Sequence, residues 1–309
     1  MYLSAETDRR LSRRRFLQIA GAAAAALPVA AFSRQAAPRI SVTDVNGLSL
    51  FQGAGCNVIA LRGKDGALMI DGGLKANADA LLKAVKEKTG NNRIHTLINT
   101  HWHPEQVGCN ETVGREGGVI FAHEKTKMYL GSAVTSITFQ GRFGPLAKEG
   151  RPTKTTLTDG SMDFDGHKID YGYLPAAHTD GDIYIHFPEM NVLVAGGVAS
   201  AEKWPIIDHR NGAWYGGRVR AFQKMAGLVK PDTRVVPAEG RLMTGADVVR
   251  HRDMYLELFD TLIAYMNMGM GPEDIPGKHP LKKYESELGD PADFLYGAFR
   301  SMEIAYVPD

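Results

Sequence analysis

The chain alternates short apolar runs with segments of helical periodicity, and this alternation limits the folds open to it. Runs of β-type residues occur at Leu48–Gln52, Asn57–Arg62 and Ala67–Ile70, with glycine-containing turns between them. The segment Ala76–Lys88 then has helical spacing, and Ile94–Asn99 is the next apolar run. This order predicts an α/β fold in which helices cover the sheets from outside.

A second block of the chain repeats the pattern. It predicts four strands, at His167–Leu174, Asp182–His186, Val192–Ala195 and Arg234–Val236. It also predicts helices at Arg218–Leu228 and Ala246–Met266 and a closing helix at Phe294–Ile304. The intervening residues 131–158 have weak periodicity and are expected to form a long surface excursion. The two blocks together favour one compact domain over residues 38–268, with residues 269–309 as an extension that packs on it.

The first 37 residues differ in character from the rest. They hold six arginines and two acidic residues, and an alanine-rich run follows the arginine cluster. That run is too short to span a bilayer, which takes about 20 apolar residues. The segment Ser12–Gln18 resembles a twin-arginine signal, which implies export by the twin-arginine machinery and a periplasmic or secreted protein. A basic helix that belongs to the fold and an uncleaved membrane anchor are the alternatives.

Charge and cysteine content narrow the function classes. The whole chain has a formal charge of +1, and residues 38–309 keep 30 basic and 33 acidic side chains, a net charge of −3. This balance argues against nucleic acid as a partner and favours a small-molecule substrate. Two cysteines, Cys56 and Cys109, are too few for a disulfide scaffold or a four-cysteine zinc site. Their pairing stays open, and buried free thiols are the simpler expectation.

Three histidines stand next to strands. His101 and His103 flank Trp102 just after a strand, and His178 lies directly before another. Spacing of i and i+2 in an extended segment puts two imidazoles on one side. Three neutral imidazoles in a loop-lined cleft would hold one Zn²⁺ ion with an open fourth position. The alternative is that each histidine is an ordinary surface or loop residue.

The segment Asn99–Gly108, NTHWHPEQVG, resembles the signature loop of the metallo-β-lactamase superfamily, which reads T-H-x-H-x-D-H. Four other segments are similar to family segments in the same order, at residues 68–73, 175–182, 191–197 and 235–240. The resemblance covers roughly residues 40–265. It implies a four-layer αβ/βα sandwich with metal ions held between two sheets at their loop ends.

The chain departs from the family pattern at one of the two metal sites. The resemblance assigns the first ion to three histidines that are all present: His101, His103 and His178. The positions that bind the second ion hold other residues, namely Glu105, Gln106, Gly197 and Glu239. An amide oxygen is a poor zinc ligand beside imidazole, and glycine supplies no ligand at all. We therefore expect one tightly bound zinc ion, at the three histidines.

Four carboxylates are expected near this ion. Freed from a second metal, Glu105 would act as a general base, and Glu239 on the opposite wall is its rival. Solvated or ion-paired acids that fill the vacated space are an equal alternative for both. Asp71 is expected to orient a histidine or a loop, and Asp182 to bond local backbone close to the third histidine.

These features predict a hydrolase that uses one metal-activated water on an ester, lactone, amide or lactam bond. The alternative is a catalytically degenerate family member that binds a ligand or a partner without turnover. A mononuclear iron oxygenase would need two histidines plus a carboxylate, and Gly197 removes that carboxylate.

Overall fold

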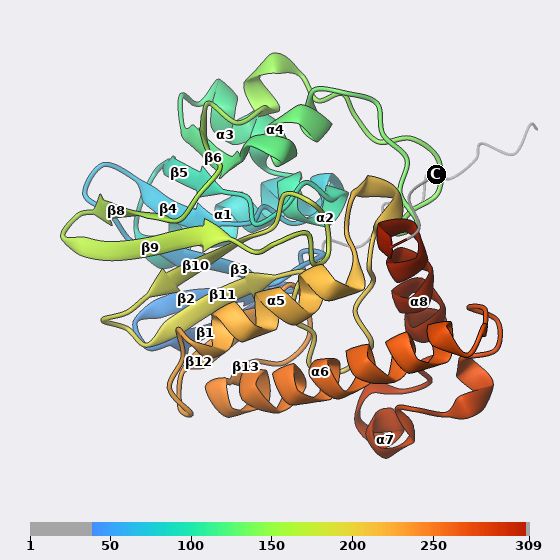
Figure 1. Cartoon of the computed structure of the whole chain (residues 1–309). Coiled ribbons are helices and arrows are strands. Elements are labelled where there is room, and N and C mark those ends of the chain that lie inside the picture. The colour runs from blue at the N-terminus through green and yellow to red at the C-terminus, as the bar shows by residue number, and fades with distance from the viewer. Residues whose placement is uncertain (1–38, 307–309) are drawn as a thin grey trace, which may run out of the picture. The chain divides into compact units, whose positions relative to one another are not determined.

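The computed structural model describes residues 39–306 of the chain. They form two β-sheets of mixed direction, which lie face to face (Figure 1). The first sheet has its strands in chain order: β1 (Ser41–Val45), β2 (Leu48–Gln52), β3 (Val58–Leu61), β4 (Ala67–Ile70), β5 (Ile94–Ile98), β6 (Val119–His123) and β7 (Lys154–Thr156). The second sheet runs in the order β13 (Met243–Thr244), β12 (Arg234–Pro237), β11 (Val192–Gly196), β10 (Ile183–Phe187), β9 (His167–Tyr173) and β8 (Gly160–Phe164).

Helices cover the outer face of each sheet (Figure 1). Those beside the first sheet are α1 (Ala78–Thr89), α2 (Pro104–Val107), α3 (Asn110–Arg115) and α4 (Glu124–Leu130). Those beside the second sheet or beyond it are α5 (Tyr215–Ala226), α6 (Gly245–Asn267), α7 (Glu285–Leu288) and α8 (Ala292–Tyr306). Single 3₁₀ turns occur at Lys75–Asn77, Lys148–Gly150, His209–Asn211, Pro276–Lys278 and Lys282–Tyr284.

Three apolar clusters hold these layers together. Alternate residues of a strand point to opposite faces, so Ile59 and Ile70 pack between the sheets, whereas Val58 and Met69 pack against α1. A third cluster joins the second sheet to α5, α6 and α8. Strands such as β3 and β4 are apolar throughout because both of their faces are buried. The predicted four-layer αβ/βα sandwich is thus the observed fold.

The strands that the sequence does not predict are the exposed ones. β1 and β8 lie at the edges of their sheets, and one residue of each is buried, so they carry no apolar alternation. The excursion over residues 131–158 is also more ordered than expected. It contains the edge strand β7 and a bridge between Val134 and Phe143, and its apolar side chains cover Trp102.

The C-terminal residues share the core of the second sheet. Leu281, Leu288 and Phe299 belong to the same apolar cluster as α5 and α6. The described residues, 39–306, all belong to one compact unit. The export signal expected at residues 1–37 lies outside the described residues.

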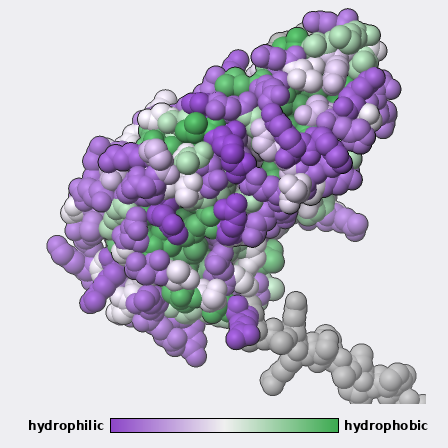
Figure 2. All heavy atoms as spheres, turned by 90° about the horizontal axis from the view of Figure 1, so that it is seen from below, coloured by the Kyte–Doolittle hydropathy of each residue, from purple (hydrophilic) through white to green (hydrophobic). Residues whose placement is uncertain are grey.

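On the face shown in Figure 2, hydrophilic side chains predominate, and apolar ones show in patches between them. Among residues 39–306 there is no helix with the length and apolarity that crossing a membrane requires.

Candidate metal centre

The three histidines singled out in the sequence meet in one buried group. His101, His103 and His178 each offer one ring nitrogen, and these nitrogens all lie within 4.8 Å of one another. The Nε2 atom of His178 is 3.0 Å from Nδ1 of His103. The rings stand edge to face, with centroids 4.7 to 4.9 Å apart. Within residues 39–306 this is the group of histidine, cysteine and acidic side chains placed to hold a metal ion.

His101 is positioned from the ends of the parallel strands β4 and β5. Asp71, which follows β4 with a positive φ of 62°, accepts hydrogen bonds from the backbone N–H and the hydroxyl of Thr100, each at 2.8 Å. The Oγ1 atom of Thr100 is in turn 3.1 Å from Nδ1 of His101. Asp71 therefore orients a histidine through Thr100. Burial raises the pKa of Asp71 to about 7, against the hydrogen bonds from Thr100.

His103 stands at the N-cap of the short helix α2 and is held by an aspartate far away in the sequence. Its Nε2 atom is 3.2 Å from Oδ2 of Asp208. The same carboxylate oxygen accepts hydrogen bonds from Ser136 and Asn211, both at 2.7 Å. Burial by itself would raise the pKa of Asp208, but the hydrogen bonds from His103, Ser136 and Asn211 outweigh burial and hold it below its usual value.

His178 lies in the loop between β9 and β10. Asp182 closes this loop, because its carboxylate accepts the backbone N–H of His178 at 2.7 Å and the backbone N–H and hydroxyl of Thr179. The Nδ1 atom of His178 is 2.8 Å from the carbonyl oxygen of Ile206. Asp182 thus bonds local backbone and fixes the loop that carries the third histidine.

These contacts determine which nitrogen of each ring is free. Thr100, Asp208 and the Ile206 carbonyl each take the N–H of one imidazole, so the lone pairs of the other three nitrogens face one another. Burial keeps two of the rings neutral: it lowers the pKa of His101 well below its usual value and that of His178 to about 3, and the neighbouring histidines add to both effects. Neutral imidazoles are the form that binds metal.

The arrangement fits a zinc ion. Nε2 of His101 is buried and has no hydrogen-bond partner among residues 39–306, a costly state for a polar atom. Three neutral imidazoles, each with its second nitrogen bonded to an oxygen, are the donor set of open zinc sites. His101, His103 and His178 would hold such an ion.

The positions of the second metal site lie in the same cavity, of about 400 Å³. A Cβ atom on Gly197 would lie 2.6 Å from Nε2 of His178, so this position has no room for a side chain. Gln106 is buried, and neither carboxamide atom has a partner among the described residues. Glu105 is partly exposed, with Oε1 4.0 Å from the free Nδ1 of His103. Glu239 is more exposed and forms an ion pair of 2.5 Å with Lys203.

One residue that sequence reasoning missed ties the site segments together. Arg218, on α5, is fully buried and donates hydrogen bonds to the carbonyls of Val198, Ala177 and Ile206. Val198 follows Gly197 in the chain, and Ala177 precedes His178. The carbonyl of Ile206 is the one that also contacts Nδ1 of His178. A lone arginine in a helical pattern gives no signal of this role. Ser136 and Asn211 are equally unremarkable in the sequence.

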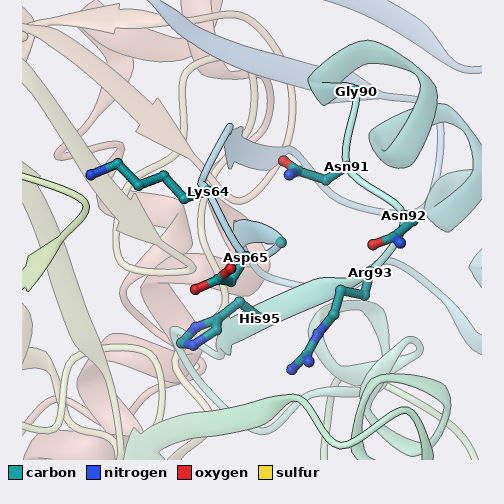
Figure 3. A pocket seen from close by; sticks show the side chains of 8 residues that line it. Lys64, Asp65, Gly90, Asn91, Asn92, Arg93 and His95 are labelled. Carbon is teal, nitrogen blue, oxygen red and sulfur yellow. The ribbon is translucent and has the colours of Figure 1, made fainter.

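A larger cavity, of about 740 Å³, lies elsewhere in the fold (Figure 3). Figure 3 shows Lys64 and Asp65 from one turn, Asn91 and Arg93 from the turn before β5, and His95 from β5 around it. His101 and His103 follow the other end of β5, and His178 lies beside them. The cavity at the three histidines is therefore the smaller of the two, and cavity volume does not identify the candidate metal centre.

Known proteins resemble the chain in sequence and in structure. A linear primary-alkylsulfatase of Pseudomonas sp. (strain ATCC 19151) is 23% identical in an alignment 261 positions long, which covers 69% of this chain and 48% of that protein. This chain thus spans about half the length of that curated relative.

Solved structures share the fold. A sec-alkylsulfatase from Pseudomonas sp. superposes with a TM-score of 0.63 at 16% identity, over 87% of this chain and 50% of that one. A metallo-beta-lactamase from Pontibacter korlensis superposes with a TM-score of 0.54 at 19% identity, over 70% of this chain and 93% of that one.

The model of one protein family covers most of the two sheets. It matches residues 52–240, a span that contains all three histidines and both glutamates of the cavity. Together with the two-sheet sandwich and the histidines at its loop end, this match places the chain in the metallo-beta-lactamase superfamily.

Proposed function

We propose that this chain is an exported hydrolase that works with one zinc ion on a small-molecule substrate. The observation that carries the proposal is the histidine group, in which three imidazoles turn one ring nitrogen each toward one another and the other toward fixed oxygens. A zinc ion bound there would lower the pKa of a water in its open position to about 7, which supplies hydroxide at neutral pH.

Glu105 is the better placed of the two candidate bases. Its carboxylate reaches to within 4.0 Å of the metal-facing nitrogen of His103, so it can accept a proton from the attacking water and return it to the leaving group. Glu239 is engaged with Lys203 on the wall of the cavity, and we assign it to holding that lysine in place.

Gln106 supplies a hydrogen-bond donor to the substrate. Its buried carboxamide lines the cavity with both polar atoms unpaired. An N–H aimed at an oxygen that gains negative charge stabilises the transition state, and more strongly in a site that excludes water. A carboxamide thus takes over, without a second metal, the stabilisation of developing charge.

The bond that is cut belongs to an ester, lactone, amide or lactam, and the likeness to two alkylsulfatases adds sulfate esters. The twin-arginine-like segment supports export to the periplasm or the medium.

The experiment is turnover of a panel of these substrates by the zinc-loaded mature protein. Activity that is lost in His101→Ala, and lost on chelation and restored by zinc in the wild type, supports the proposal. Glu105→Gln should lower kcat by about 10²-fold or more, whereas Glu239→Gln should lower it much less. Bound zinc without turnover of any substrate would favour the alternative, a degenerate ligand-binding protein.

A further inference from the structure

A second cavity adjoins the one at the histidines. It measures about 430 Å³, and the segment Lys203–Ile207 forms part of its wall. The first four residues of that segment also line the histidine cavity. The two cavities are therefore separated by one stretch of chain and follow each other across the surface.

Apolar side chains stand exposed along both cavities. Leu74 lines the histidine cavity and is 40% exposed, and Ile137 lines the second cavity and is 38% exposed. Ile206, which lines both, is 45% exposed. Single exposed apolar residues are ordinary, but three from separate parts of the chain at adjoining cavities mark a binding surface.

The wall between the cavities is built rigidly. The indole of Trp204 stacks on Phe294 of α8 with centroids 5.0 Å apart, and its N–H donates to the carbonyl of Gly289 at 2.8 Å. The tryptophan presents an apolar face because its polar atom is already bonded. The second cavity is also lined by Asp290 and Asp293, whose carboxylates would repel a negative group there.

We propose that the substrate is an amphiphile with an uncharged aliphatic chain. Its hydrolysable group lies over the three histidines, and its chain runs along the wall formed by Trp204 and Ile206 to Ile137. The proposal rests on the hydrolase function proposed above and specifies the class of substrate for the same site. The apolar side chains along the two cavities lose contact with water when the chain binds, which is the driving force for its recognition.

The experiment is a series of p-nitrophenyl acyl esters, from butanoate to decanoate, used below their micelle concentrations with the zinc-loaded protein. Because burial of a methylene contributes about 0.8 kcal/mol, kcat/KM should rise roughly threefold or more per added methylene until the cavity is filled. Ile137→Ser should flatten this rise. Leu157→Ser, at another exposed leucine that lines neither cavity, should leave it as in the wild type.

A series in which kcat/KM stays flat or falls with chain length would overturn the inference while leaving the hydrolase function intact. Equal chain-length dependence in Ile137→Ser and wild type would also overturn it. If no ester is turned over, calorimetric binding of 1-butanol to 1-decanol to the zinc-loaded protein decides. A Kd that falls with chain length, and falls less in Ile137→Ser, supports the apolar site, and a Kd independent of length refutes it.

Discussion

Gly197 lies against the imidazole of His178, and this contact favours the proposed one-metal site. Family members place an acidic bridge between two ions where this chain has Gly197, and the imidazole of His178 occupies the space that a Cβ atom would need. Two metals therefore cannot be regained by restoring the acid alone, because the ring would have to move first.

We predict that Gly197→Asp lowers zinc binding below one ion per chain and does not raise it to two. Its Cβ atom would push against Nε2 of His178, 2.6 Å away, and displace a ligand. Metal analysis after dialysis measures the stoichiometry. Gly277→Ala, where an added Cβ meets open space, is the matched control. A variant that binds two zinc ions would refute the steric account.

Asp208 is predicted to raise zinc affinity without touching the ion. Asp208→Ala removes the acceptor that fixes Nε2 of His103, and such a loss typically weakens metal binding by about 10- to 100-fold. Competition with a chromophoric chelator measures the Kd. Asp260→Ala, at an exposed aspartate of α6, should bind zinc as the wild type does. Unchanged affinity in Asp208→Ala would show that His103 needs no orientation.

The sequence was sufficient to find the histidines and insufficient to find the groups that hold them. His101 and His103 are visible because two imidazoles at i and i+2 follow a strand. Asp208 is 105 residues from the histidine it contacts, and no local pattern joins them. The preference for Glu105 over Glu239 is equally invisible, since it depends on an ion pair with Lys203.

At the scale of elements, α6 carries a buried histidine that should make the fold sensitive to acid. His251 packs near Phe222 and Tyr255 in the core of the second sheet, and burial lowers its pKa to about 4. An unfolded chain restores the ordinary value near 6.5. The unfolded state therefore binds more protons between pH 6.5 and 4, so stability is full above this window and is lost as the pH falls through it.

We predict that His251→Leu loses less stability on acidification than the wild type. Between pH 7.5 and pH 5 the wild type should lose about 2 kcal/mol more free energy of unfolding than the variant, from this histidine alone. Urea denaturation at both pH values measures the difference. His279→Asn, at an exposed histidine, should keep the pH dependence of the wild type. Parallel losses in His251→Leu and wild type would contradict the linkage.

Buried elements were predictable and exposed ones were not. β3, β4 and β11 are apolar on both faces, so their composition alone marks them as strands. β1 and β8 are edge strands whose residues are mostly exposed. They form because an adjacent strand pairs with them through backbone hydrogen bonds, and their own residues carry no pattern that indicates this pairing.

At the scale of the whole molecule, the two cysteines contribute to the apolar core as buried side chains. Cys56 and Cys109 are free and buried in the cluster between the first sheet and its helices. Burial raises the pKa of Cys109 to about 12 and that of Cys56 well above its usual value, which keeps both thiols protonated and unreactive.

We predict that a thiol reagent labels neither cysteine in the native protein and both in denaturant. The melting temperature should be the same with and without a reducing agent, because no disulfide contributes to stability. Rapid labelling of a native thiol, or a melting temperature that falls on reduction, would contradict this view of the core. The outcome also bears on export, since thiols that never meet solvent tolerate an oxidising compartment.

The four-layer fold follows from the order of apolar runs and from the family resemblance together. Periodicity alone favours α/β layers with outer helices. It does not specify how two sheets face each other, and that step came from the family motifs. The core positions Ile275, Leu281 and Leu288 escaped both, because the glycine- and proline-rich segment 269–291 has no clear period.

The central claim is that one metal ion at three histidines makes this protein a hydrolase. Its most direct test is to add zinc stepwise to chelator-treated mature protein, and to follow bound metal and turnover of the best panel substrate in the same samples. We predict that both saturate together at one zinc per chain, and that His101→Ala shows neither. Saturation at two ions, or full occupancy without turnover, would contradict the account.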